Sequence, residues 1–219
     1  MTRTADAAAQ APHAARVAPP RQLMLACGAL ARELLAIRDA NGWDHLDLHC
    51  LPADLHLRPE RIPDAVTAAV VRHRADYAGI IVVYADCGTG GLLAARCAEL
   101  GVQMVPGPHC YAFFDGIEAH AARAETEFTA FYLTDFLVRQ FDAFVWRPMG
   151  LDRHPELRDM YFAHYDRLIH LAQTDDPVLD LGAREAADRL GLRHERRDVG
   201  YGDLPALLAQ LSSSASQYR

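Results

Sequence analysis

The stretch that decides the fold is "AGIIVVYADCGTGGLLAARCAELG", residues 78–101. Its apolar run "GIIVV" is typical of a buried strand, and the glycines that follow are typical of a tight turn. The run "LLAARCAEL" then indicates a helix that stops at Gly101. A buried strand that leads through a turn into a helix is part of a β-α-β unit, so this stretch points to a parallel sheet covered by helices.

The same alternation runs through most of the chain. Predicted strands cover residues 21–27, 45–52, 78–86, 102–107, 128–134, 167–173 and 193–202. Predicted helices cover residues 30–42, 58–76, 91–101, 116–127, 135–145, 154–167, 179–191 and 203–214. We therefore expect an α/β fold with a mostly parallel, Rossmann-like sheet of about six or seven strands and helices on both faces. Two smaller lobes around a cleft, residues 21–115 and 116–211, are the alternative.

Composition restricts the class of protein. Of 219 residues, 51% are hydrophobic and 23% charged, which suits one soluble domain over residues 21–211. The net charge is −7 and basic residues form no dense block, so we expect no nucleic-acid partner. All 22 basic residues are arginine, which excludes lysine Schiff-base chemistry and a lysine-containing phosphate loop. No run of 18 apolar residues exists, so we expect no membrane partner.

The two ends of the chain differ from its middle. Residues 1–20 are rich in alanine and proline without the apolar run of a secretory signal, which predicts a disordered leader. Residues 212–219 are predicted to be a frayed tail. We accordingly expect a cytoplasmic protein. In that compartment its five cysteines would be free, catalytic or bound to metal rather than paired in disulfides.

Three cysteines fall at equivalent places in the predicted fold. Cys27 ends the first predicted strand, Cys87 ends the third, and Cys110 lies just past the fourth. The carboxyl ends of parallel strands face one crevice, so these thiols should meet at one rim of the sheet. Gly28 and Gly88 directly follow two of the cysteines and would let the backbone approach a bound group closely.

Three thiolates favour a soft metal centre, either zinc or a [4Fe-4S] cluster with one iron open to substrate. His109, next to Cys110, is then a candidate fourth ligand or proton donor. Asp86 and Asp135 would orient these groups, and Asp135 is, with His109, a candidate catalytic residue. The alternatives are that each cysteine is a buried core residue, as we expect for Cys50 and Cys97, or that Cys87 and Cys110 form a reversible disulfide.

The glycine loop allows a second kind of site. The backbone N–H groups of Gly88 and Gly90, with the Thr89 hydroxyl, could hold a phosphate or carboxylate. The loop matches neither common nucleotide-binding motif, and a simple tight turn is the alternative.

Other polar residues near predicted strand ends have two interpretations each. His56, Arg58 and Arg61 would bind a substrate anion or face solvent. Asp135 and residues 174–176 would cap helices or face the rim, and we favour capping.

The blocks "ACGAL", "YADCGTGG", "PGPHCY" and "TDFLVR" carry a family resemblance. Over about residues 22–211 the chain resembles a family of uncharacterised bacterial and archaeal proteins known only as a domain of unknown function. The resemblance implies no reaction. Members occur in organisms with methylotrophic and corrinoid-dependent methyl-transfer metabolism, which gives a context. Cys27, Cys87, His109 and Cys110 all fall inside these blocks.

The sequence therefore favours a three-cysteine metal or iron–sulfur site that acts on a small molecule. A non-catalytic module that binds a small anion or a corrinoid is one alternative. A thiol redox protein is the other.

Overall fold

The computed structural model describes residues 19–214. The predicted leader falls outside the described residues except for its last two prolines, and residues 215–219 of the predicted tail fall outside as well. Residues 212–214, which we also expected to be frayed, instead form the end of the last helix.

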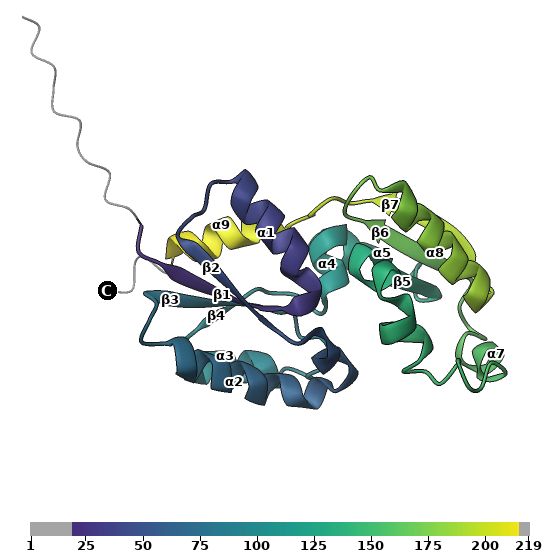
Figure 1. Ribbon diagram of the computed structural model, residues 1–219, viewed down its shortest axis with the longest axis horizontal. Coiled ribbons are helices and arrows are strands. Elements are labelled where there is room, and N and C mark those ends of the chain that lie inside the picture. Colours follow the sequence, from purple (N-terminus) through teal and green to yellow (C-terminus); the bar gives the residue numbers. More distant parts are fainter. Residues whose placement is uncertain (1–18, 215–219) are drawn as a thin grey trace, which may run out of the picture.

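The chain forms two parallel sheets that lie side by side (Figure 1). The first has the strand order β2-β1-β3-β4, with β1 at Gln22–Cys27, β2 at Leu46–Leu51, β3 at Gly79–Val83 and β4 at Gln103–Met104. The second has the order β5-β6-β7, with β5 at Ala130–Thr134, β6 at Arg167–Ala172 and β7 at Arg193–Asp198. The predicted α/β fold is confirmed.

A single sheet of six or seven strands does not form, and each sheet has fewer strands than predicted. The predicted strand 102–107 shrinks to the two residues of β4. Val105 still donates a backbone hydrogen bond to Val82, but Pro106 and Pro108 have no N–H to continue the pairing. The chain then leaves the first sheet and builds the second.

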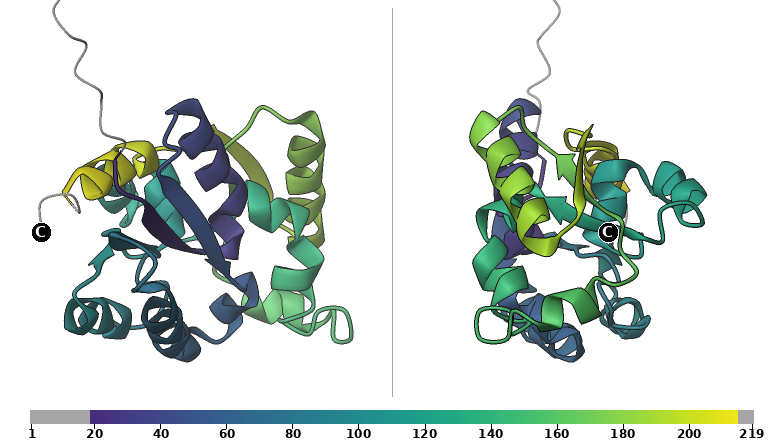
Figure 2. Two further views of the ribbon diagram at one scale, coloured as in Figure 1. Left: turned by 60° about the vertical axis from the view of Figure 1, so that its left-hand side comes forward. Right: turned by 90° about the vertical axis from the view of Figure 1, so that its right-hand side faces the viewer.

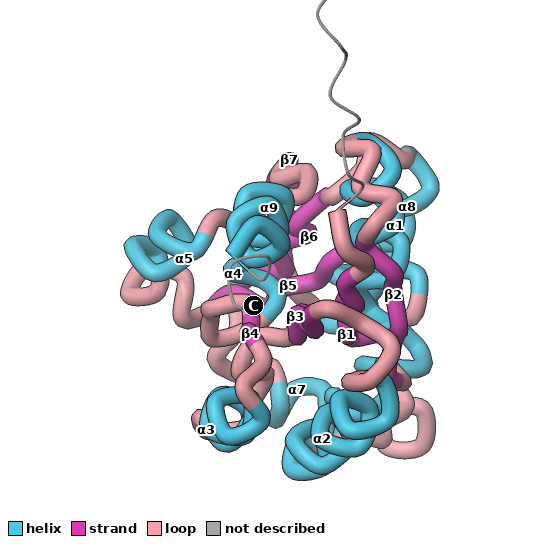
Figure 3. The backbone as a smooth tube through the Cα atoms, turned by 90° about the vertical axis from the view of Figure 1, so that its left-hand side faces the viewer, coloured by secondary structure: helices cyan, strands magenta, loops and turns pink. Residues whose placement is uncertain are grey.

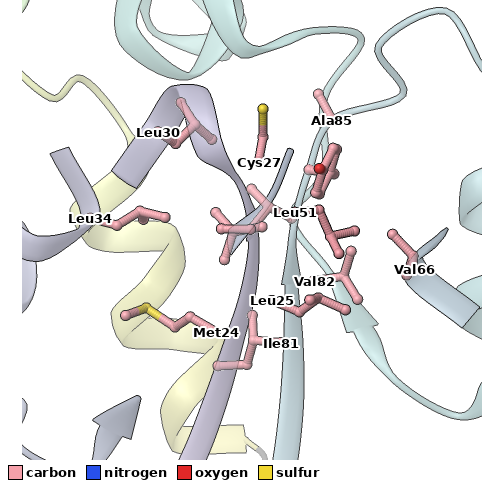
Figure 4. Packing of buried hydrophobic residues seen from close by; sticks show 14 of the residues in the cluster. Met24, Leu25, Cys27, Leu30, Leu34, Leu51, Val66, Ile81, Val82 and Ala85 are labelled. Carbon is pink, nitrogen blue, oxygen red and sulfur yellow. The ribbon is translucent and has the colours of Figure 1, made fainter. Parts of the chain in front are cut away.

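The first lobe consists of the first sheet and four helices: α1 (Ala31–Ala40), α2 (Ile62–His73), α3 (Leu92–Leu100) and α9 (Leu204–Ser214). Figures 1 and 3 show α1 and α9 on one face of the sheet and α2 and α3 on the other, and Figure 2 shows α2 and α3 side by side. All six residues of the central strand β1 are buried, because helices cover both faces. Figure 4 shows Met24 and Leu25 of this strand packed near Ile81 of β3.

The second lobe consists of the second sheet and four helices: α5 (Ile117–Arg123), α6 (Asp135–Arg139), α7 (Leu157–Tyr161) and α8 (Pro177–Leu190). Leu168 packs in the cluster beneath α8, whereas Ile169 packs on the opposite face near Tyr111 and Tyr132. This alternation is the two-residue period of a strand covered on both faces.

Two predicted helices of this lobe are shorter than expected. The predicted helix 135–145 ends at Arg139, and a π-helix follows at Asp142–Trp146. The wider π turn breaks the regular hydrogen-bond ladder. The predicted helix 154–167 keeps only the five residues of α7, because the chain must turn at Phe162 to enter β6 at Arg167.

The chain passes between the lobes twice. It leaves the first lobe through a helix missed by the sequence analysis, α4 (Cys110–Asp115), and it returns through residues 199–203 to α9. Leu204 and Leu208 of α9 are buried in the core cluster of the first sheet. The division into lobes at residues 115 and 116 stays a prediction. The last helix, although it follows the second lobe in sequence, packs with the first sheet.

Candidate functional site

Cys27, Cys87 and Cys110 lie close enough together to affect one another's ionisation. The Cys27 thiol interacts electrostatically with Cys87, and Cys110 interacts with both. Cys27 is the buried last residue of β1, Cys87 follows β3, and Cys110 begins α4. We call these three residues the thiol cluster. Their closeness was predicted from the position of each cysteine at or after the carboxyl end of a parallel strand.

Backbone pairing beyond the strands brings Cys87 toward Cys110. The N–H of Asp86 donates to the carbonyl of Gly107, and the N–H of Cys87 donates to the carbonyl of Pro108, both at 3.0 Å. The N–H of Cys110 in turn points at the Cys87 sulfur and favours its thiolate form. Cys87 has a φ of 49°, the only positive φ of a non-glycine residue among residues 19–214.

Burial disfavours the thiolate form of all three cysteines. Burial raises the pKa of Cys27 to about 12, although the Ala29 N–H, 3.3 Å from the sulfur, opposes the rise. Burial also raises the pKa of Cys87, and it raises that of Cys110 well above the usual thiol value. Free thiolates are therefore scarce in this cluster, and a positively charged ligand would be needed to stabilise them.

The imidazole beside the thiol cluster is His56. Its Nδ1 lies 3.4 Å from the Cys27 sulfur and 3.3 Å from the carbonyl oxygen of Ala53. Its ring stacks on Tyr84 with centroids 6.2 Å apart. Burial lowers the pKa of His56, so the ring is neutral. His56 lies in a 3-10 helix, Ala53–Leu57, after β2.

The sequence pattern grouped His56 with Arg58 and Arg61 and did not reveal its contact with a thiol. That contact depends on strand order: β2 neighbours β1 in the sheet, so the segment after β2 reaches the rim beside the segment after β1. Arg58 and Arg61 themselves are exposed.

His109 faces other partners. Its ring packs against Tyr111 with centroids 5.2 Å apart and against His120 at 4.9 Å. Its Nδ1 is buried without a hydrogen-bond partner among the described residues. Burial, and then His120, lower the pKa of His109. Its predicted role as metal ligand or proton donor stays a prediction.

The glycine loop already holds a carboxylate, that of Asp86. Asp86 accepts hydrogen bonds from the Thr89 hydroxyl at 2.7 Å, the Gly90 N–H at 3.1 Å and the Gly91 N–H at 2.7 Å. These bonds lower the pKa of Asp86. Gly88 has a φ of 84° and Gly90 one of 62°, as a tight turn requires. The turn interpretation thus gains support, and an external anion would have to displace Asp86. Gly28 packs beside Leu51 and Ala53, where a Cβ would lie 3.0 Å from the Leu51 carbonyl.

Asp135 is fully buried and does not cap α6. Thr134 is the N-cap residue, and its hydroxyl accepts from the Leu137 N–H at 3.3 Å. Asp135 lies one residue further on and binds the segment after β6. It accepts from His170 Nε2 at 3.0 Å and from the Thr174 hydroxyl at 2.6 Å. These bonds give Asp135 a structural role, and its catalytic role stays a prediction.

The remaining predicted positions have ordinary packing or capping contacts. Asp176 is the N-cap of α8 and accepts from the Val178 N–H at 2.9 Å. Asp175 forms an exposed ion pair with Arg196 at 3.2 Å. Cys97 is buried in α3. Cys50 is half-buried and also interacts electrostatically with Cys27.

A cavity of about 320 Å³ adjoins the thiol cluster. Its walls come from both lobes: on one side the 3-10 helices Gly28–Leu30, after β1, and Ala53–Leu57, after β2, and on the other side β5, α6 and the π-helix. Phenylalanine, leucine, valine, methionine and alanine side chains make up most of the lining. Its polar members are His56, Cys110, Tyr111 and Thr134. An apolar cavity with a few polar groups at one place is the usual form of a small-molecule site.

The side chains as they stand do not form a complete metal site. Within residues 19–214, no group of three or more histidine, cysteine, aspartate or glutamate side chains could hold a metal ion. One distance between two candidate ligand atoms does fit a zinc site. In tetrahedral zinc, bonds of ~2.3 Å to sulfur and ~2.1 Å to nitrogen place the sulfur and nitrogen atoms about 3.6 Å apart. The Cys27–His56 distance of 3.4 Å is close to this value.

In the part of the chain that the structure describes, no helix is both long enough and apolar enough to cross a membrane.

The fold and the site define an α/β protein with two parallel sheets and, between them, an apolar cavity beside the thiol cluster, of which Cys27 is buried and Cys87 and Cys110 are half-buried. The chain belongs to the family described as "Protein of unknown function (DUF1638)", whose model matches residues 50–208. The match includes His56, Cys87 and Cys110, whereas Cys27 precedes it. Neither the curated proteins nor the solved structures contain a significant match to the chain.

Proposed function

We propose that this protein binds a small, mainly apolar molecule in the cavity between its lobes, and that a metal centre on the thiol cluster acts on that molecule. One observation carries the proposal: the thiol cluster and the cavity share Cys110, and His56 connects the cavity to Cys27. Cys110 is a member of the thiol cluster and lines the cavity, and His56 lines the cavity and contacts Cys27. A molecule in the cavity would therefore lie next to Cys110 and to the imidazole that contacts Cys27.

The residues that would hold the metal are Cys27, Cys87 and Cys110, with His56 in place of the predicted His109. A metal ion would displace the thiol protons, which the high pKa values of this cluster otherwise retain. Zinc would supply Lewis-acid chemistry or a thiolate that can accept a methyl group. That role would fit the methyl-transfer context of the family.

Zinc and a [4Fe-4S] cluster would place different demands on these side chains. A single zinc ion needs all its donors around one point, and no three donors among residues 19–214 meet that requirement without side-chain rotation. A four-iron cluster binds each cysteine through a different iron atom, so its thiolates lie further apart. Three cysteines would leave one iron open toward the cavity.

Metal content tests this part. The protein is purified without oxygen, and iron, sulfide and zinc are measured per chain for the wild type, Cys87→Ala and Cys97→Ala. We expect about four iron and four sulfide, or one zinc, in the wild type and in Cys97→Ala, and a large loss in Cys87→Ala. Metal-free wild type, or equal content in both variants, would refute the metal centre.

Ligand binding is tested separately. Calorimetry with octan-1-ol and 4-phenylbutan-1-ol measures occupation of the cavity, and alkylation of Cys110 measures its accessibility. We expect at least one alcohol to bind and to slow the alkylation. Ala53→Leu, which fills the cavity, should abolish both effects, whereas Ala95→Leu on an exposed face of α3 should preserve them. Binding that survives Ala53→Leu, or no binding by the wild type, would contradict the proposal.

Thiol redox chemistry is the second candidate, and the contact between the Cys110 N–H and the Cys87 sulfur favours it. The raised pKa values oppose it, because the thiolate is the attacking species in exchange. Titration of free thiols before and after mild reduction distinguishes the two. Two additional thiols after reduction would indicate the disulfide, and no change would exclude it.

A third function, as a carrier of a corrinoid or a small anion, has less support than the other two. The donors of the glycine loop are engaged by Asp86, and a corrinoid ring is larger than the cavity.

A further inference from the structure

We propose that the two lobes close over the cavity when a ligand binds, and that Glu33 of the first lobe and Arg139 of the second form an ion pair in the closed state. This inference rests on the proposed function, because the ligand between the lobes drives the closure.

The first observation is a buried carboxyl group at the junction of the lobes, one oxygen of which lacks a hydrogen-bond partner within residues 19–214. The Glu33 side chain on α1 is only 4% exposed, and its Oε2 has no hydrogen-bond partner among the described residues. Buried carboxylate oxygens are normally paired, so an unpaired one calls for a specific explanation. Burial raises the pKa of Glu33, and the nearby Arg139 opposes that rise. Arg139 thus interacts electrostatically with Glu33, but it forms its ion pair with Asp135 in this structure.

The second observation is that Arg139 is loosely held where it is. Its nearest carboxylate is Asp135, with N···O at 3.6 Å. Charge-assisted hydrogen bonds usually measure about 2.7–2.9 Å. Asp135 already accepts shorter bonds from His170 and Thr174, so it loses little when Arg139 moves.

The third observation is that each member of the pair follows a cavity-lining residue by about one helical turn, although neither lines the cavity itself. Ala29 lines the cavity, and Glu33 follows it four residues later along the same helical segment. Phe136 lines the opposite wall, and Arg139 follows it three residues later on α6. Residues three or four apart share one face of a helix. Pairing of Glu33 with Arg139 would thus draw the two walls of the cavity together.

The fourth observation is a hinge where the chain crosses between the lobes. Asp203 links the two crossings: its N–H donates to the Phe113 carbonyl at 2.8 Å, and its Oδ2 accepts from the Ile117 N–H at 2.8 Å. Gly116 and Gly202 beside these bonds have φ values of 81° and 51°. Two crossings tied at one place allow rotation of one lobe against the other about that place, and a few residues can absorb such a change.

A double-mutant cycle tests the pairing, with affinity for 4-phenylbutan-1-ol as the readout. We expect Glu33→Gln and Arg139→Gln each to weaken binding about tenfold, which is the effect of about 1.4 kcal/mol. The double variant should lose no more than either single variant, because both remove the same interaction. Glu33→Gln also removes a buried charge, so this variant should fold.

A matched control uses the exposed pair Arg96 and Glu99 on α3, which are 2.8 Å apart. Arg96→Gln and Glu99→Gln should leave the affinity unchanged. Small-angle scattering provides the independent measurement: the radius of gyration of the wild type should fall on saturation with the alcohol, and that of Arg139→Gln should fall less.

The outcomes separate the two proposals. Closure is supported if Glu33→Gln and Arg139→Gln weaken alcohol binding without adding in the double variant, and if the radius of gyration of the wild type decreases on binding. If the alcohol binds but the effects of Glu33→Gln and Arg139→Gln add or vanish, or the radius is unchanged, closure is wrong and the cavity proposal stands. If neither alcohol binds to the wild type, the cavity proposal fails and closure falls with it.

Discussion

Replacement of Asp135 by alanine should cost about 3–5 kcal/mol of unfolding free energy, because a fully buried charge that is hydrogen-bonded on several sides is lost. Its side chain accepts from the Gln173 and Thr174 N–H groups at 3.1 Å each, in addition to the Thr174 hydroxyl and His170 Nε2. Alanine would leave these donors buried without an acceptor. The loss would be a large part of a typical domain stability of about 5–15 kcal/mol.

Urea unfolding measures this loss, with fluorescence reporting on both lobes because Trp43 packs on the first core and Trp146 on the second. The control is Asp175→Ala, whose side chain is 94% exposed and which should cost less than about 1 kcal/mol. A loss below about 1 kcal/mol for Asp135→Ala with an unchanged urea dependence would refute the structural role.

The same variant has a defined pH dependence. Burial by itself would raise the pKa of Asp135, but the bonds from His170 and Thr174 lower it overall. A lowered carboxyl pKa contributes stability above the unfolded-state value of about 3.9 and loses it as the pH falls through the folded-state value. The difference between the wild type and Asp135→Ala should therefore be constant near neutral pH and shrink only in acid.

Three further predictions follow from particular contacts. Gly202→Ala should prevent folding, because the added Cβ would lie 2.2 Å from the Phe113 carbonyl oxygen. Gly200→Ala has open space around it and should cost only about 1–2 kcal/mol of unfolding free energy, measured by urea unfolding. The rate of alkylation of Cys27 in the metal-free protein, followed by mass spectrometry, should rise about tenfold per pH unit between about pH 8 and pH 10. The reason is that the pKa of Cys27 is about 12 and only the thiolate reacts. A plateau of the rate near pH 9 would contradict this. Arg197→Gln should lose stability at neutral pH, because Arg197 binds Asp115 and Glu127, whose pKa values are lowered despite burial. The difference from the wild type in urea unfolding should shrink only as the pH falls through the lowered folded-state pKa values of these carboxylates, and a loss that shrinks already between pH 7 and pH 5 would disprove the assignment.

The parallel sheet and the meeting of the three thiols were predictable from sequence because both depend on local patterns. The run "GIIVV" specifies a buried strand wherever the chain goes afterwards, and the carboxyl ends of parallel strands share a rim whichever strands are neighbours. Cys27 and Cys87 therefore came together as expected.

The division into two sheets was less predictable, because it depends on where strand pairing stops. Only two residues of the predicted strand 102–107 pair, and no periodicity reveals that number. The role of His56 depends on strand order, which places β2 beside β1. Asp135 was expected as a cap, and a shift of one residue toward Thr134 turned it into a buried anchor for the segment after β6. Such single-residue offsets are below the precision of sequence patterns.

The left-handed backbone at Cys87 has a consequence for how this position would change under selection. A φ of 49° disfavours any residue with a Cβ by roughly 1–2 kcal/mol, so stability alone would favour glycine there. A library randomised at position 87 and sorted only for resistance to heat or protease should converge on glycine. Sorting for bound iron or zinc should instead recover cysteine, with a measurable loss of thermal tolerance.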